Sequence, residues 1–194
     1  MMGFDADAAI SYTWVALALV WLVGLGFTKR TVQSQPVGTR LFQLAVAALG
    51  FLLLSRHCRE WFPYDWLFVR FAAHTAAIAY TALLLTVAGC AFAIWARFTL
   101  GRNWSGRVTV KDDHELVTRG PYALTRHPIY TGLLVALAGT ALAVGQWRGV
   151  VALVVILIAF VLKMAQEEKM MVQTFPAAYP AYRQRVKALI PGIF

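Results

Sequence analysis

The stretch that decides the fold runs from Pro128 to Leu162 and reads PIYTGLLVALAGTALAVGQWRGVVALVVILIAFVL, with Arg148 as its one charged residue. A helix that spans a membrane needs about 20 mostly apolar residues. Two apolar runs, joined by the short turn GQWRG, approach that length here. A tight turn near Gly145 keeps such helices antiparallel. The stretch therefore predicts a helical hairpin within a membrane.

The rest of the chain has the same apolar character. Of its 194 residues, 60% are hydrophobic and 14% are charged, against roughly 25% charged residues in a soluble domain. Flanking Arg40, Arg56 and Lys163 can lengthen the shorter apolar runs by snorkelling. We therefore expect an all-α integral membrane protein with about five transmembrane helices. The charge-free runs are 8–28, 41–55, 71–96, 128–147 and 149–162.

The basic residues predict how the helices are oriented. The start of the chain, MMGFDADA, contains no basic residue and so lacks the charged leader of a cleavable signal peptide. With the N-terminus outside, 14 of the 18 basic residues lie inside, and the C-terminus is cytosolic, as the positive-inside rule favours. The net charge of +9 then reflects contact with anionic headgroups rather than nucleic acid. The basic residues left outside are Arg56, Arg59, Arg70 and Arg148.

Several patterns indicate packing rather than chemistry. Small residues recur at four-residue spacing, which lets helices approach closely in lipid. The segment WFPYDW, residues 61–66, resembles an aromatic belt at the outer surface. Cys58 and Cys90 form no CxxC or His/Cys cluster, so we expect neither a disulfide nor a metal site. The small-residue pairs are Ala72/Ala76, Gly89/Ala93, Gly132/Ala136 and Gly139/Ala143.

The polar segment before the hairpin, LVTRGPYALTRHPIYTG (116–132), predicts a site for an anion. Pro128 suits the first turn of a helix, where its missing N–H is not needed. The free N–H groups of that turn carry partial positive charge, and Arg126 and His127 directly precede them. The alternative is that Arg126 and His127 are ordinary positive-inside residues at a helix end.

The segment after the hairpin supplies acidic and aromatic residues. Glu167 and Glu168 are expected just beyond the last helix, and because neighbours on a helix diverge by about 100°, we expect one of them to face a pocket. An even number of passes returns the chain to its starting side, so both polar segments are expected on one face. A joint pocket is then the economical hypothesis. The stripe 175, 179, 182, 186 and 189 predicts an amphipathic helix starting near Pro180.

These motifs resemble the isoprenylcysteine carboxyl methyltransferases and their prokaryotic relatives, with phospholipid N-methyltransferases as more distant relatives. The resemblance covers roughly 97–194, so we divide the chain into a three-helix membrane region, 1–96, and a methyltransferase-like region, 97–194. Pro176 and Met171 depart from the residues common in the family. The matching pieces are LGRNWS (100–105), HELVTRGPY (114–122), RHPIYTG (126–132), Glu167-Glu168 and FPAAYPAYRQRV (175–186) with LIPGIF (189–194).

The resemblance implies transfer of a methyl group from S-adenosyl-L-methionine to a lipophilic acceptor that enters from the bilayer, most favourably the carboxylate of an isoprenylcysteine-like substrate. A carboxylate is already nucleophilic, so such an enzyme mainly aligns it and excludes water. The candidates to orient it are Arg102, Asn103 and Arg126. Implied cofactor contacts are His114, Leu116, Val117, Gly120, Pro121, Tyr122, Arg126, His127, Pro128, Tyr130, Glu167 and Glu168.

Three other functions stay open at this point. A phospholipid N-methyltransferase would share the cofactor site but would need a general base for its amine acceptor. An NADPH-dependent membrane sterol or enone reductase would need a basic cluster for the 2′-phosphate, and none is evident. A membrane scaffold without catalytic activity would leave the clustered polar residues unexplained.

Overall fold

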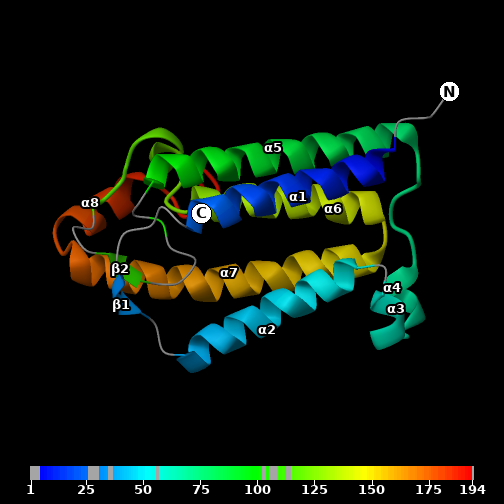
Figure 1. Ribbon diagram of the computed structural model, residues 1–194, viewed down its shortest axis with the longest axis horizontal. Coiled ribbons are helices and arrows are strands. Elements are labelled where there is room, and N and C mark those ends of the chain that lie inside the picture. Colours follow the sequence, from blue (N-terminus) through cyan, green and yellow to red (C-terminus); the bar gives the residue numbers. More distant parts are fainter. Residues whose placement is uncertain are drawn as a thin grey trace.

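Five long helices run side by side along the longest axis of the molecule (Figure 1). The computed structural model describes residues 5–25, 31–34, 37–55, 57–101, 104, 109–111 and 115–193. Four of the helices are long and apolar enough to cross a membrane, whereas α6 is shorter, with 17 residues. The expected multi-pass, helical membrane architecture is confirmed. The helices are α1 (Ala6–Leu25), α2 (Val37–Leu54), α5 (Ala76–Leu100), α6 (Pro128–Val144) and α7 (Trp147–Thr174).

The ends of two helices differ from expectation. Glu167 and Glu168 do not follow the last helix but lie inside α7, which continues to Thr174. Residues 150–175 contain no Gly or Pro, and most of the residues after Lys163 are good helix formers, so nothing ends the helix earlier. At the other helix, Thr75 caps α5 by accepting a hydrogen bond from the Ile78 N–H. Ala72 therefore lies outside α5, and the expected Ala72/Ala76 packing pair is wrong.

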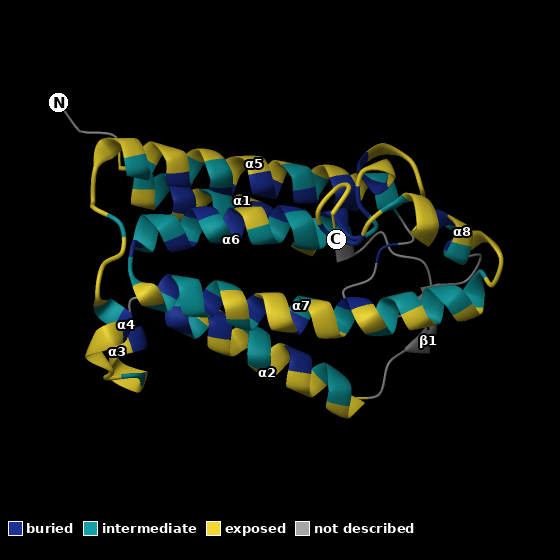
Figure 2. Ribbon diagram, turned by 180° about the vertical axis from the view of Figure 1, so that it is seen from behind, coloured by how far each residue is buried: buried dark blue, intermediate teal, exposed yellow. Residues whose placement is uncertain are grey.

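The helices form two layers, α1 with α5 and α6, and α2 with α7 (Figure 1). The first layer has a buried cluster of Leu17, Cys90 and Ala136. The second layer packs Leu53 and Ala152 around Cys58. Many residues on the outward faces are exposed (Figure 2), as expected of helices that face lipid; large apolar examples are Leu19, Leu84, Phe98 and Val154.

Glycines let α5 and α6 approach closely. A Cβ atom built on Gly132 would lie 2.6 Å from the carbonyl oxygen of Gly89 and 2.7 Å from the backbone nitrogen of Ala93. A Cβ on Gly139 would lie 2.6 Å from the carbonyl oxygen of Ala82. Two of the small-residue pairs, Gly89/Ala93 and Gly132/Ala136, thus meet across this helix pair. Their contact fixes where the first turn of α6 lies.

Short elements close the two ends of the bundle. At one end lie α3 (Cys58–Trp61) and α4 (Asp65–Phe68), and the exposed Trp61, Tyr64 and Trp66 of the predicted aromatic belt lie on these elements or between them. At the other end lie the 3-10 helix η2 (Gly120–Ala123) and α8 (Ala178–Arg185); we call this the α8 end. The helix predicted near Pro180 is therefore present.

One small sheet at the α8 end adds to the expected helical fold. Strand β1 (Thr31–Ser34) pairs antiparallel with β2 (Thr109–Lys111), with Thr31 opposite Lys111 and Ser34 opposite Thr109. The strands belong to two loops that are far apart in sequence, one after α1 and one after α5. The sheet therefore joins these loops where they leave their helices.

Arg148 joins the start of α7 to the end of α2 at the α3–α4 end. Its Nη1 donates to the carbonyl oxygens of Leu53, at 2.9 Å, and Ser55, at 2.6 Å, where α2 ends. Its Nε donates to the Gln146 side chain at 2.6 Å. A cation at a helix C-terminus is favourable because the last carbonyls carry partial negative charge. The one charged residue of the hairpin therefore has a structural role.

The close contact of α5 and α6 predicts the effect of adding one methyl group. Gly132→Ala forces the α5 backbone away, and we expect it to lower the free energy of unfolding by roughly 1–3 kcal/mol, the usual cost of overpacking. Gly38→Ala is the control, because a Cβ there meets nothing within 4 Å, and we expect no loss. Thermal unfolding of the detergent-solubilised protein measures both. Equal effects of the two changes would contradict the contact.

Candidate functional site

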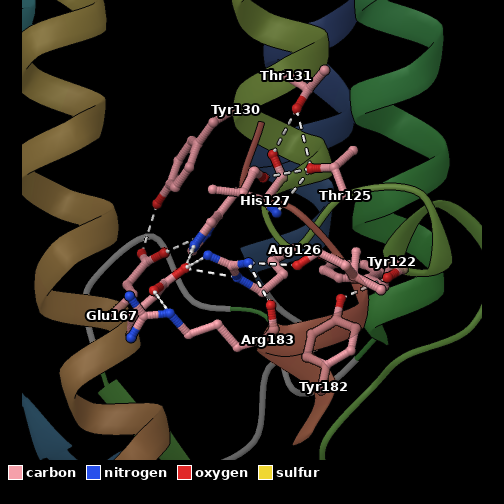
Figure 3. Close-up of polar contacts among 12 residues, drawn as sticks. Tyr122, Thr125, Arg126, His127, Tyr130, Thr131, Glu167, Tyr182 and Arg183 are labelled. Carbon is pink, nitrogen blue, oxygen red and sulfur yellow. Dashed lines mark hydrogen bonds and ion pairs between the residues drawn. The ribbon is translucent and has the colours of Figure 1, made fainter. Parts of the chain in front are cut away.

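The polar residues that the sequence singles out meet at the α8 end of the bundle (Figure 3). They come from the loop before α6, the first turn of α6, the last turns of α7, and α8 with the segment that follows it. The two polar segments thus meet in one network of hydrogen bonds and ion pairs, whereas the joint pocket stays a prediction. Figure 3 shows Arg126, His127, Tyr130 and Glu167 directed toward one another.

The loop before α6 is held by the chain that follows α8. The backbone N–H groups of Arg126 and His127 donate to the carbonyls of Lys187 and Ala188, at 2.8 and 3.0 Å. The hydroxyl of Thr125, which is fully buried, donates to the same Ala188 carbonyl at 2.6 Å. Because these bonds use backbone groups of both segments, the loop and the C-terminal segment form one unit.

The short helix η2 forms the wall beside this unit. Gly120 adopts a positive φ of 60°, which permits the turn into the buried Pro121 and Tyr122. The hydroxyl of Tyr182, on α8, donates to the Tyr122 carbonyl at 2.6 Å. Burial raises the pKa of Tyr182 to about 12, so this hydroxyl keeps its proton and the bond at neutral pH.

All three side-chain nitrogens of Arg126 donate hydrogen bonds to groups of the protein. Its Nε and Nη2 donate to Oε1 of Glu168, at 2.8 and 2.6 Å. Its Nη1 donates to the carbonyl oxygens of Val186 and Arg183. The exposed fractions of the two charged side chains are 8% for Arg126 and 14% for Glu168. This guanidinium therefore links α7 to the C-terminal segment.

His127 lies between both glutamates, although only one was expected to face this network. Its Nε2 is 3.2 Å from Oε1 of Glu168, and its Nδ1 is 3.6 Å from Oε2 of Glu167. The two ring nitrogens point in different directions, so one ring reaches two side chains that diverge on α7. The hydroxyl of Tyr130 also donates to Oε1 of Glu167, at 2.6 Å.

The charge of these glutamates controls the protonation of His127. Burial by itself lowers the pKa of the imidazole, but the hydrogen bonds to and the charges of Glu167 and Glu168 outweigh it, and the pKa is raised. The protonated ring can donate from both nitrogens, one toward each carboxylate. The network therefore favours an imidazolium between two carboxylates.

Two cations of this site, Lys163 and Arg183, were not among the predicted site residues. Lys163 places its Nζ 5.5 Å from the centre of the Tyr130 ring, which also stacks on His127 and Phe160. Arg183, on α8 and 58% exposed, places Nε 3.4 Å from Oε2 of Glu168. For Lys163 a signal existed, because a charge next to an apolar run is a candidate functional residue. Arg183 lies within the family-like piece 175–186, but the motif assigned it no role.

The remaining predicted residues fall into two groups. Leu116 and Val117 lie half-buried in the loop before η2, and Pro128 opens α6 as expected. Arg102, Asn103 and His114 lie outside the described residues. Among the described residues, no group of three His, Cys, Asp or Glu is arranged to hold a metal ion.

Arg97 is a further cation near the site, and it donates hydrogen bonds to backbone carbonyls. Arg97, on α5 and 5% exposed, donates to the carbonyls of Gly24 and Gly101, at 2.7 and 2.9 Å. Its guanidinium lies 4.3 Å from the centre of the Trp104 ring. Because both carbonyls belong to helix ends, Arg97 joins the ends of α1 and α5 beside the site.

A cavity of about 740 Å³ lies between the two helix layers. Helices α1, α2 and α6 line it, and its walls are almost entirely apolar. It has the size of ligand pockets, roughly 300–1,000 Å³. The lining residues are Trp14, Leu17, Ala18, Trp21, Leu22, Phe51, Leu54, Ser55, Leu133, Leu137 and Thr140.

Comparisons with known proteins match this region of the chain. Residues 82–173 match the family model of the isoprenylcysteine carboxyl methyltransferase (ICMT) family. A probable protein-S-isoprenylcysteine O-methyltransferase of Oryza sativa subsp. indica is 32% identical over 119 residues, 60% of this chain and 62% of that protein. The Mus musculus protein-S-isoprenylcysteine O-methyltransferase is 34% identical over 116 residues, 58% of this chain and 41% of its own length.

A solved structure supports the same relationship. The eukaryotic intramembrane Ras methyltransferase ICMT superposes with a TM-score of 0.54 at 25% identity, covering 78% of this chain and 53% of that one. The chain thus spans less than two thirds of the length of each of these relatives. Together the matches confirm the resemblance to the ICMT family that the motifs indicate.

The raised pKa of His127 predicts a pH dependence of stability. A folded-state pKa above the unfolded value of about 6.5 means that His127 stabilises the fold fully below that pH, and that this contribution is lost as pH rises through the folded-state pKa. We expect the difference in Tm between wild type and His127→Gln to be largest near pH 6 and to shrink on the alkaline side. Thermal scans across this range measure it.

The matched control for this experiment is His74→Gln, because His74 is exposed and lies outside the network. Its Tm difference from wild type should stay small, because an exposed side chain outside the network has few contacts to lose. A His127→Gln difference that grows toward alkaline pH would show that the imidazole is neutral in the folded protein.

Proposed function

We propose that this chain, as a relative of the ICMT family, transfers a methyl group from S-adenosylmethionine to a lipophilic acceptor in the membrane. The favoured acceptor is the carboxylate of an isoprenylcysteine-like compound. One observation carries the proposal: the residues that match the family model, 82–173, include His127, Tyr130, Glu167 and Glu168 of the buried network. The relatives' names supply the reaction class, and the network supplies clustered charged and polar side chains at the α8 end.

The donor groups of the site suit the cofactor. S-adenosylmethionine supplies an electrophilic methyl on a sulfonium, and it also carries an ammonium, a carboxylate, a diol and an adenine. Carboxylates can bind the ammonium or the diol, and the buried tyrosine and proline walls suit the adenine. The chemistry of this donor set therefore fits, with Glu168 and Glu167 as the acidic partners and Pro121, Tyr122, Leu116 and Val117 as candidate walls.

One carboxylate oxygen is the best placed for a ligand. Oε1 of Glu168 is shared by Arg126 and His127, whereas Oε2 is 3.4 Å from Arg183, which is 58% exposed. A ligand that displaces the Arg183 side chain would reach Oε2 without breaking the buried Arg126 pair. We assign Glu168 to the cofactor and give Arg126 the task of holding the C-terminal segment around it.

The acceptor needs orientation more than activation. A carboxylate is a nucleophile at neutral pH, so the protein must align it and exclude water. Arg126 has its donors directed at Glu168 and at backbone carbonyls, which leaves it poorly placed to hold a second carboxylate. Arg102 and Asn103 stay candidates for that role on the sequence argument alone.

Binding measurements test the assignment. We expect calorimetric titration of the purified protein to show binding of S-adenosylhomocysteine and no binding of NADPH. Glu168→Gln should weaken S-adenosylhomocysteine binding by roughly tenfold to a hundredfold, the effect of removing one charge-assisted hydrogen bond of about 1.5–3 kcal/mol. The control is Glu60→Gln, an exposed glutamate at the α3–α4 end.

Two outcomes would contradict the assignment. Binding of NADPH alone would favour the reductase alternative. Unchanged S-adenosylhomocysteine affinity in a folded Glu168→Gln variant, with Tm near wild type, would remove Glu168 from the cofactor site. If that variant does not fold, Arg183→Ala supplies the second measurement, because this exposed residue should be displaced by the ligand and its loss should not weaken binding.

We further propose that the N-terminus lies outside and that the α8 end faces the cytosol. The support is the excess of basic residues on one side, 14 of 18, in keeping with the positive-inside rule. Single cysteines at Gln184 in α8 and at Asp65 in α4 should react with a membrane-impermeant maleimide from opposite sides. The native Cys58 and Cys90 are buried, so background labelling should be low. Labelling of the Gln184→Cys variant from outside would reverse the orientation.

A further inference from the structure

The apolar cavity is lined by one face of each of three helices. On α1 the lining residues recur every three or four positions, from Trp14 to Leu22, which is the spacing of a single helix face. Two hydroxyls in the cavity lining donate hydrogen bonds to backbone carbonyls. Ser55 donates to the Leu52 carbonyl at 2.8 Å, and Thr140 donates to the Ala136 carbonyl at 3.0 Å. Among the described residues that line the cavity, none is charged. Its walls therefore suit a hydrocarbon and not a polar ligand.

The cavity begins one helical turn from the charged network. Leu133, which lines it, follows Tyr130 by three residues on α6, so both lie on the same helix face. The Tyr130 hydroxyl donates to Glu167. At the same end Trp21 makes an edge contact with Trp104, with ring centres 6.3 Å apart. A molecule whose polar end lies at the network would thus extend its apolar part into this cavity.

Trp14 crosses the cavity farther along. Its ring N–H donates to the Thr140 hydroxyl on α6 at 2.9 Å. Its ring also makes an edge contact with Phe51 on α2, with ring centres 6.4 Å apart. Trp14 lies seven residues before Trp21 on α1, or about 10 Å at 1.5 Å per residue. One side chain of α1 therefore reaches both other walls at a defined distance from the site.

With the proposed function, this cavity would hold the hydrocarbon chain of the methyl acceptor, and we propose that Trp14 sets the length of chain that fits. The inference rests on the proposed function, which supplies an acceptor with a polar end at the network. A peptide does not suit the cavity, because its backbone polar groups would find no partners on these walls. A flexible hydrocarbon chain needs none, and it can enter from the lipid between the helices.

Acceptors of graded length test the proposal. We would assay S-alkylated cysteine analogues that carry ten-, fifteen- and twenty-carbon prenyl chains. Ala18→Trp fills the cavity between Trp21 and Trp14, and we expect it to lower kcat/KM for the longer chains by roughly tenfold or more, with little effect on the shortest. Trp14→Ala opens the far end and should raise kcat/KM for the longest chain relative to the shortest.

A neighbouring residue provides the matched control. Leu19 follows Ala18 on α1 but points outward, with 56% of it exposed, so Leu19→Trp adds the same bulk outside the cavity. Its profile across chain lengths should equal that of wild type. Ala18→Leu, a smaller change, gives the second measurement if Ala18→Trp does not fold. Ala18 and Leu19 variants with the same length profile would overturn the proposal.

A photo-crosslinking readout separates this inference from the proposed function. A prenylcysteine analogue with a diazirine at the end of its chain should label α1 near Trp14, α2 near Phe51 or α6 near Thr140, and Ala18→Trp should reduce the labelling at least several-fold. Labelling there without turnover would support the cavity and overturn the carboxylate acceptor. Turnover with labelling confined to other segments would overturn the cavity and leave the proposed function standing.

Discussion

The buried pair of Arg126 and Glu168 is the interaction on which the site depends. Each charge alone would be costly to bury near the membrane, by several kcal/mol after relaxation. The pair offsets that cost because His127 and two backbone carbonyls complete its hydrogen bonds. The pair and its partners come from the loop before α6, from α7, and from α8 with the residue that follows it. These three segments must therefore meet for the hydrogen bonds of the pair to be complete.

The glycine contact between α5 and α6 positions the start of α6 for these interactions. Because Gly132 packs directly on the α5 backbone, the start of α6 has one position relative to the rest of its layer. His127 and Tyr130 lie within the turn next to Gly132, and their side chains reach across to Glu167 and Glu168 on α7. Helix packing in the apolar region thus sets the geometry of polar groups at its edge.

The apolar runs predicted the long helices, whereas the motifs predicted only part of the site. Runs without charge predict helices because a charge in lipid is costly, and all five runs became helices. The extent of α7 was missed because hydropathy falls after Lys163 while helix propensity does not. The sheet of β1 and β2 was missed because it pairs two distant loops. Such pairing depends on where the helices bring the loops, and a single segment carries no sign of it.

Within the site, side-chain types were predictable and their partners were not. Arg126 was expected to hold a ligand, yet its donors point to Glu168 and to carbonyls of residues 183 and 186. Every residue has a carbonyl, so no motif marks these two as its partners.

The backbone pairing of residues 126–127 with 187–188 has a further consequence for the order of synthesis. Since α8 follows all five long helices in the chain, the ribosome produces the membrane bundle before the segment that completes the site. The newly inserted bundle therefore lacks the carbonyl partners of Arg126, and the site is complete only when that segment docks.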